Sequence, residues 1–138
     1  MKYRAAVTAD SVRVSILVAH VLVEEMFEQV IAEAVPNSEC FRVPKMSFAR
    51  KLEVVRRLDS NGNSPFWTLV QKLNDLRVAA AHRDYESSRT ARFGEVESAL
   101  RSMYPHSIWR DDEELVKLVA ASCFDYLKTM KDRFRKPA

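Results

Sequence analysis

Only two of the 138 residues are glycine, Gly62 and Gly94. Tight β-hairpin turns and bulges depend on glycine because they need positive φ angles, so this chain has little material for a β-sheet. Apolar residues instead recur at spacings of three and four, as on one face of an α-helix. With 47% hydrophobic and 30% charged residues, the chain can form a real core. We therefore expect a single all-α domain over residues 1–138, an antiparallel bundle of about five helices.

The expected helices have clear start and stop signals. The first runs from about residue 8 or 10 to 35, is apolar on most sides, and is ended by Pro36. Ser47 caps a second helix over 48–58, and Ser64 followed by Pro65 begins a third, which ends near residue 82. The pattern breaks over 83–92, so the fourth helix is expected over about 93–103. Asp111 and Asp112 suit the start of a fifth helix, which runs to about residue 134.

Composition narrows the class of protein. Cys40 and Cys123 lie far apart and match no zinc or redox spacing, which predicts free thiols in a reducing cytoplasm. The three histidines are scattered, so we expect no metal and no other cofactor. Charges interrupt the apolar run at 16–23, so neither an export signal nor a membrane span is expected. A net charge of +3 permits an anionic partner without identifying one.

Arg77 interrupts the apolar pattern of the third helix. At about 100° per residue it projects into the stripe of Phe66, Val70, Leu73 and Ala80, so the sequence predicts a cation on a buried face. A buried guanidinium needs an anionic or carbonyl partner. One interpretation is a buried ion pair with Glu24 or Glu25 of the first helix, with His82 at the helix end favourable to its dipole. The other is a binding site for a phosphate.

A resemblance to a known family favours the second interpretation. Residues 73–82 (LNDLRVAAAH) are similar to the Arg-x4-His signature of the HEPN superfamily (higher eukaryotes and prokaryotes nucleotide-binding), which ends a helix of a small bundle. Residues 22–25 (LVEE) and 47–52 (SFARKL) resemble parts of the mannitol operon repressor-like group of that superfamily. The resemblance covers roughly residues 14–85.

The resemblance implies a metal-independent endoribonuclease, often a toxin or antiphage effector restrained by a partner protein, that acts as a homodimer with the motif in a shared cleft. Arg77 would then stabilise the scissile phosphate, and His82 would act as general acid or base. The chain departs from the family at two positions. Val78 stands where catalytic members usually have a polar residue directly after the arginine. Tyr85 is the candidate supporting residue of the site, but it lies three residues after the histidine, whereas related toxins often have a tyrosine two residues after it.

Two hypotheses remain open. In the first, Arg77 and His82 cleave RNA, and a basic rim that includes Arg50, Lys51 and Arg83 binds its phosphates. The same basic residues can equally be interpreted as a solvated helix surface that binds no RNA. In the second, which Val78 favours, the chain is a non-catalytic regulator or protein-interaction module, and Arg77 is structural. Under both, the breadth of apolar surface on the first helix predicts a homodimer.

Overall fold

The computed structural model describes residues 2–37, 42–83 and 85–135, with side chains described from residue 11 onwards. The described chain is helical and contains no strand. Its elements are α1 (Lys2–Ala34), the short 3-10 helix η2 (Val43–Lys45), α2 (Phe48–Leu58), α3 (Pro65–Ala80), α4 (Tyr85–Met103) and α5 (Asp112–Phe134). The all-α bundle expected from the sequence is therefore confirmed.

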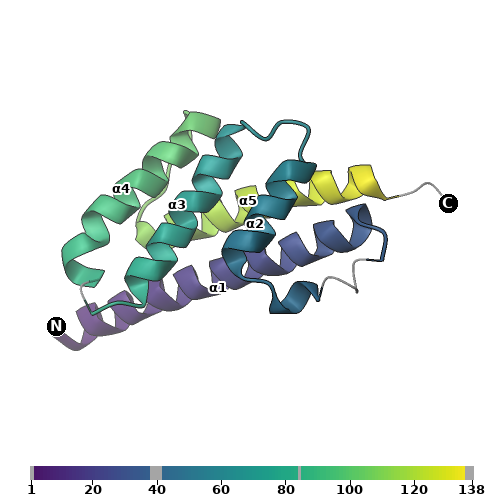
Figure 1. Cartoon of the computed structure of the whole chain (residues 1–138). Helices are drawn as coiled ribbons and strands as arrows, with labels where there is room; N and C mark the ends of the chain where they lie inside the picture. Colours follow the sequence, from purple (N-terminus) through teal and green to yellow (C-terminus); the bar gives the residue numbers. More distant parts are fainter. Residues whose placement is uncertain (1, 38–41, 84, 136–138) are drawn as a thin grey trace.

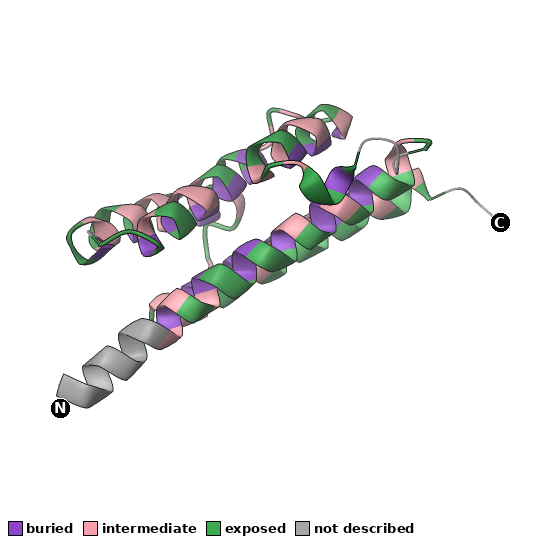
Figure 2. Cartoon of the chain, turned by 60° about the horizontal axis from the view of Figure 1, so that its bottom comes forward, coloured by how far each residue is buried: buried purple, intermediate pink, exposed green. Residues whose placement is uncertain are grey.

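The helices form two layers (Figures 1 and 2). One layer is α1 packed along α5, and the other is α3 packed on α4, while α2 lies against α1. Polar contacts at both ends show that α1 runs parallel to α5, which corrects the antiparallel arrangement expected from the sequence for this pair of helices. At one end the Ser11 and Ser15 hydroxyls lie 3.3 Å from the Glu113 carboxylate, and at the other the Lys131 ammonium donates to Gln29 at 3.0 Å. Figure 1 shows α3 running obliquely across α1 and α5.

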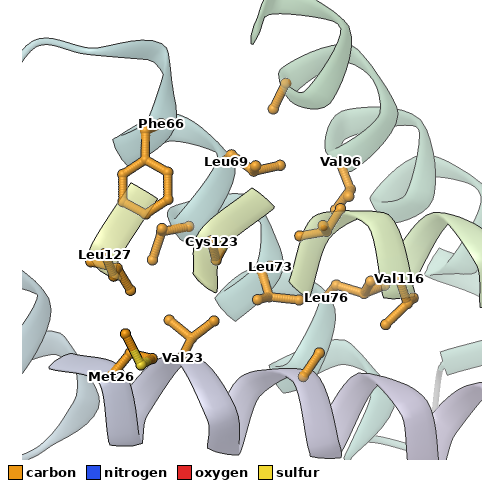
Figure 3. Packing of buried hydrophobic residues seen from close by; sticks show 14 of the residues in the cluster. Val23, Met26, Phe66, Leu69, Leu73, Leu76, Val96, Val116, Cys123 and Leu127 are labelled. Carbon is orange, nitrogen blue, oxygen red and sulfur yellow. The ribbon is translucent and has the colours of Figure 1, made fainter. Parts of the chain in front are cut away.

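The core lies between the two layers (Figure 3). The apolar stripe predicted for the third helix is buried along its length, and Leu69, Leu73 and Leu76 are fully enclosed. Burying a side chain of this size stabilises the fold by roughly 1.5–3 kcal/mol. Cys123 also lies in the core, where burial raises the pKa of its thiol to about 12. Cys40 lies outside the described residues.

The capping signals predicted three helix starts correctly. The Ser47 hydroxyl accepts the N–H of Arg50, and the Ser64 hydroxyl accepts the N–H of Phe66 beside the expected proline. The Asp111 carboxylate accepts the N–H of Glu114 at 2.8 Å. Each bond satisfies a backbone donor that the first helical turn leaves without a partner.

Two predicted boundaries are wrong. The first helix begins at Lys2 instead of residue 8 or 10, and α4 begins at Tyr85 instead of 93. Residues 86–92 contain no large apolar side chain, so hydrophobic periodicity could not reveal that this first part of α4 is helical. Tertiary contacts stabilise the start of α4 instead. The buried ring of Tyr85 lies 4.5 Å from the Arg13 guanidinium, and Arg89 pairs with Asp112 at 3.0 Å.

A buried carboxylate ties three helices together at the other end of the bundle. Asp59, the residue after α2, accepts hydrogen bonds from the Trp67 indole of α3 at 2.8 Å and from the Tyr126 hydroxyl of α5. The Tyr126 ring also stacks on Phe66, with ring centroids 3.9 Å apart. Asp59 therefore acts as a shared acceptor for α3 and α5, a role that no sequence motif indicates.

In the described part of the chain, none of the helices is both long enough and apolar enough to cross a membrane.

Candidate functional site

The candidate site is built on the last turn of α3 and the short connection to α4. The N–H of Ala81 reaches the carbonyls of Arg77 and Val78, and the N–H of His82 donates to Ala79 at 3.0 Å. The His82 carbonyl then accepts the N–H of Tyr85, the first residue of α4, at 3.3 Å. These bonds hold His82 at a fixed place between two packed helices, although its side chain is exposed.

Arg77 is exposed, which corrects the expectation that it lies on a buried face. Phe66 and Val70 occupy the same angular sector of α3 and are fully buried, and Ala80 in the last turn is only 8% exposed, whereas Arg77 is exposed. Within the described residues, no carboxylate lies in ion-pair range of the Arg77 guanidinium. Its cost of desolvation is therefore small, and its donors remain available to a ligand.

The ion pair expected between Arg77 and Glu24 or Glu25 is not the one that forms. The Lys51 ammonium, which is 0% exposed, lies 2.8 Å from the carboxylates of both Glu24 and Glu28. Burial alone would lower the pKa of Lys51, but its two hydrogen-bonded carboxylates raise it overall. Lys51 thus joins α2 to α1 and cannot serve the exposed basic rim predicted from the sequence. Glu25 is exposed on α1.

Arg77 acts electrostatically on a buried histidine of α1. His20 is 5% exposed, lies 3.0 Å from the Asn74 side chain, and packs against the Phe48 ring at 4.0 Å between centroids. Burial lowers the pKa of His20, and the charge of Arg77 lowers it further. His20 therefore favours its neutral form and serves as a packed, hydrogen-bonded core residue.

His82 borders a hollow of about 340 Å³ between α3 and α4, with Asp75, Val78, Ala79, Ser88 and Arg92. Arg92 forms an ion pair with Glu95 at 3.3 Å, so it brings a cation that is already partly neutralised. Asp75, Val78 and His82 follow one another at spacings of three and four along α3, a pattern that could have revealed this surface. A histidine, a carboxylate and a guanidinium around an open hollow can support acid–base chemistry on a phosphate ester.

Arg77 does not line the hollow of His82. The two residues share one helix end and are both exposed, but five positions on a helix place them about 140° apart. Of the predicted rim, Arg50 and Arg83 are exposed, and Arg50 pairs with Glu53 at 3.5 Å. The structure therefore brings Arg77, His82 and Arg83 to one end of α3, while Arg50 lies on α2.

Tyr85 cannot contact a substrate in this structure, because its side chain is 0% exposed. Its hydroxyl has no hydrogen-bond partner among the described residues, and burial raises its pKa. The ring instead packs beneath Arg13 and anchors the start of α4. The expectation that Tyr85 supports the site is therefore corrected to a structural role.

We expect Tyr85→Phe to leave the free energy of unfolding unchanged or raise it by up to about 1 kcal/mol. The substitution keeps the packed ring and removes a buried hydroxyl that lacks a partner. Urea denaturation followed by circular dichroism measures the change. A loss of more than about 1 kcal/mol would show that this hydroxyl is hydrogen-bonded in solution.

Comparison of the chain with protein-family models, curated proteins and solved structures gives no match. Across the described side chains, no three histidine, cysteine, aspartate or glutamate residues are grouped as they would be to hold a metal ion.

Proposed function

We propose that the chain is a HEPN-like, metal-independent endoribonuclease that uses Arg77 and His82 at the C-terminal end of α3. The observation that carries the proposal is the exposed guanidinium of Arg77, which has no carboxylate partner among the described residues, at the same helix end as an exposed and backbone-anchored histidine. An arginine that served only to stabilise the fold would be expected to pair with one of the nearby acidic residues.

The two side chains suit the two tasks of RNA cleavage. Arg77 presents a permanently charged, forked donor that matches two phosphate oxygens and stabilises the extra negative charge of the transition state. His82 takes the proton of the 2′-hydroxyl or donates one to the leaving 5′-oxygen. Five residues correspond to a rise of about 7.5 Å along a helix, which the long arginine stem spans when it bends toward the helix end.

The hollow beside His82 would hold a nucleotide next to the scissile phosphate. Val78, which is 42% exposed, offers an apolar contact, and the Arg92 guanidinium offers a second cation. Arg83 is exposed and follows His82 directly, so it extends the positive charge along the path proposed for the RNA chain. We propose that the protein acts in the cytoplasm as a toxin or defence effector, and that an antitoxin or regulatory protein restrains it.

A second candidate function is a non-catalytic regulatory or protein-interaction module of the mannitol repressor-like kind. The exposed apolar side chain of Val78 favours it, because that position adjoins the arginine and would suit contact with a protein better than contact with a phosphate. In this case Arg77 and His82 would contribute to a binding surface without chemistry.

Cleavage of mixed RNA in EDTA distinguishes the two functions. We expect the purified protein to cleave, and Arg77→Ala and His82→Ala each to reduce the rate at least about 100-fold. Matched controls are Arg110→Ala, at a guanidinium whose side chain is 90% exposed, and His106→Ala, at an exposed histidine in a turn. Both controls should keep the full rate, and circular dichroism should show all variants folded. No cleavage, or equal cleavage by every variant, would favour the regulator.

A further inference from the structure

The hollow beside His82 carries two opposite charges on neighbouring helices. α3 and α4 pack along each other and are joined by a short connection, so they run antiparallel. Asp75 of α3 and Arg92 of α4 both line the hollow, which has a volume of about 340 Å³. Among the described residues these two side chains form ion pairs with other partners but not with each other. The hollow therefore keeps a carboxylate and a guanidinium apart.

Both groups retain hydrogen-bonding capacity that the fold does not use. The Arg92 guanidinium contacts the two oxygens of Glu95 through Nη1 alone, at 3.3 and 3.4 Å. Its Nε and Nη2 atoms, which form a forked donor pair, have no partner in the described part of the chain. The Asp75 carboxylate has only distant partners, the Lys72 ammonium at 3.9 Å and the Gln71 amide at 3.4 Å. A carboxylate has about four lone-pair sites, so Asp75 can accept further hydrogen bonds.

The charges around the hollow cancel one another. The Lys72 ammonium also lies 3.2 Å from Glu95, so two cations and two carboxylates form one network across the two helices: Lys72, Arg92, Asp75 and Glu95. A phosphate would gain little here, because repulsion by the carboxylates offsets attraction by the cations. A neutral, flat group with donors and acceptors of its own fits better, and the exposed Val78 offers its ring an apolar contact. A nucleobase has this chemistry.

We propose that this hollow binds guanine. Guanine has two adjacent donors, N1–H and the 2-amino group, which match the two oxygens of Asp75, and two acceptors, O6 and N7, which match the forked donors of Arg92. Adenine and cytosine would each turn an unprotonated ring nitrogen toward one oxygen of Asp75, and uracil would offer that carboxylate a single ring donor. Of the four RNA bases, guanine satisfies both side chains at once.

The position of His82 determines which bond would be cut. Asp75 and His82 are seven residues apart, which corresponds to a rise of about 10 Å on a helix, comparable to the distance from the edge of a base to its own 3′-phosphate. A guanosine bound between Asp75 and Arg92 therefore brings its own 2′-hydroxyl toward His82, which lines the same hollow. Cleavage is expected on the 3′ side of guanosine. This last step rests on the proposed function, whereas binding of the base does not.

Titration with the four nucleoside 3′-monophosphates tests the site without any cleavage. Nuclear magnetic resonance spectra of the isotope-labelled wild-type protein should show the guanosine compound binding at least about 10-fold more tightly than the other three. The largest shifts should occur at the amides of Val78 and Ala79, which line the hollow. The phosphate is common to all four ligands, so a difference in affinity reports the base alone. Equal affinities, a preference for another base, or no binding at millimolar concentration would overturn the proposal.

Base analogues test the contact of each side chain separately. Inosine 3′-monophosphate lacks the 2-amino group, so the wild-type protein should bind it about 5-fold more weakly than the guanosine compound, and Asp75→Ala should bind the two equally. The 7-deazaguanosine compound lacks N7, and its similar loss of affinity should disappear in Arg92→Met. A general effect of a substitution on folding would weaken every ligand alike and leave these ratios unchanged. Ratios that persist in both variants would overturn the assignment.

Arg101→Met is the matched control for Arg92→Met. Arg101 also lies on α4, its side chain is 46% exposed against 42% for Arg92, and it likewise pairs with a glutamate, Glu97, at 3.4 Å. It does not line the hollow, so this variant should keep the wild-type affinity for every ligand.

Mapping the cleavage positions in a mixed RNA separates this site from the proposed function. Cuts should fall on the 3′ side of guanosine. Cleavage without base preference would overturn the guanine site and leave the ribonuclease standing. Selective binding of the guanosine compound by a protein that cleaves no RNA would support the guanine site and remove the ribonuclease function.

Discussion

Replacing Lys51 by alanine is expected to lower the free energy of unfolding by about 3 kcal/mol. The Lys51 ammonium is fully buried and holds two carboxylates at 2.8 Å, so the substitution leaves Glu24 and Glu28 facing each other without their cation. Removing one partner of a buried ion pair costs about 3–5 kcal/mol. We take the lower end because both glutamates remain about one-third exposed and can be hydrated.

Arg50 provides the matched control for Lys51. It is the preceding residue on α2, its side chain is 64% exposed, and its ion pair with Glu53 lies at the surface. Arg50→Ala should therefore cost less than about 1 kcal/mol. Combining Lys51→Met with Glu24→Gln and Glu28→Gln removes all three charges. This triple variant should recover most of the free energy of unfolding that Lys51→Ala loses. Equal effects of Lys51→Ala and Arg50→Ala in urea denaturation would contradict the buried arrangement.

The Lys51 contribution should not vary across the neutral range. Because the folded-state pKa of Lys51 is raised, its stabilisation is complete below the unfolded value of about 10.4 and is lost only as the pH rises above it.

Replacing Asp59 by alanine is expected to cost about 3 kcal/mol, the second large effect on stability. The substitution leaves the Trp67 indole N–H and the Tyr126 hydroxyl without their shared acceptor and also removes a bond to the N–H of Asn61. Hydrogen bonds to a charged group contribute about 1.5–3 kcal/mol each, and partial access of water to Tyr126 reduces the sum. Thermal unfolding at neutral pH measures the loss.

The pH dependence of Asp59 gives that prediction a second readout. Burial raises its pKa, but the bonds from Tyr126, Asn61 and Trp67 outweigh this, so the pKa is lowered overall. A lowered pKa stabilises the fold above the unfolded value of about 3.9 and loses this effect as the pH falls through the folded value. Asp59→Ala should therefore destabilise the protein less at acidic pH than at pH 7. Asp125→Ala, on the exposed side of α5, is the control and should cost less than about 0.5 kcal/mol.

Local signals were enough to predict much of the fold. Ser47, Ser64 and Asp111 cap their helices because the bond from a side-chain oxygen to the next turn depends on nearby residues alone. The apolar stripe of α3 is buried as its spacing predicts. The start of α4 could not be predicted, since it depends on Arg13 and Asp112, which are distant in sequence.

The candidate site was harder to predict because burial depends on how helices cross. Arg77 lies on the same side of α3 as Phe66 and Val70, yet it is exposed whereas those two residues are buried. Lys51 shows the opposite error, because a lysine on a basic helix was expected to be exposed and is instead enclosed by two glutamates of α1. Helical spacing defines a face of a helix, but it does not give which positions on that face a neighbouring helix covers.

The most direct test of the central claim is cleavage of one RNA oligonucleotide beside its 2′-deoxy counterpart in EDTA by the wild-type protein. The proposed chemistry requires the 2′-hydroxyl, from which His82 transfers a proton while Arg77 stabilises the phosphate. The RNA should be cut to fragments that end in a 2′,3′-cyclic phosphate and begin with a 5′-hydroxyl, and the deoxy strand should stay intact. Cleavage of both strands, or of neither, would contradict the assignment of the α3 end as a ribonuclease site.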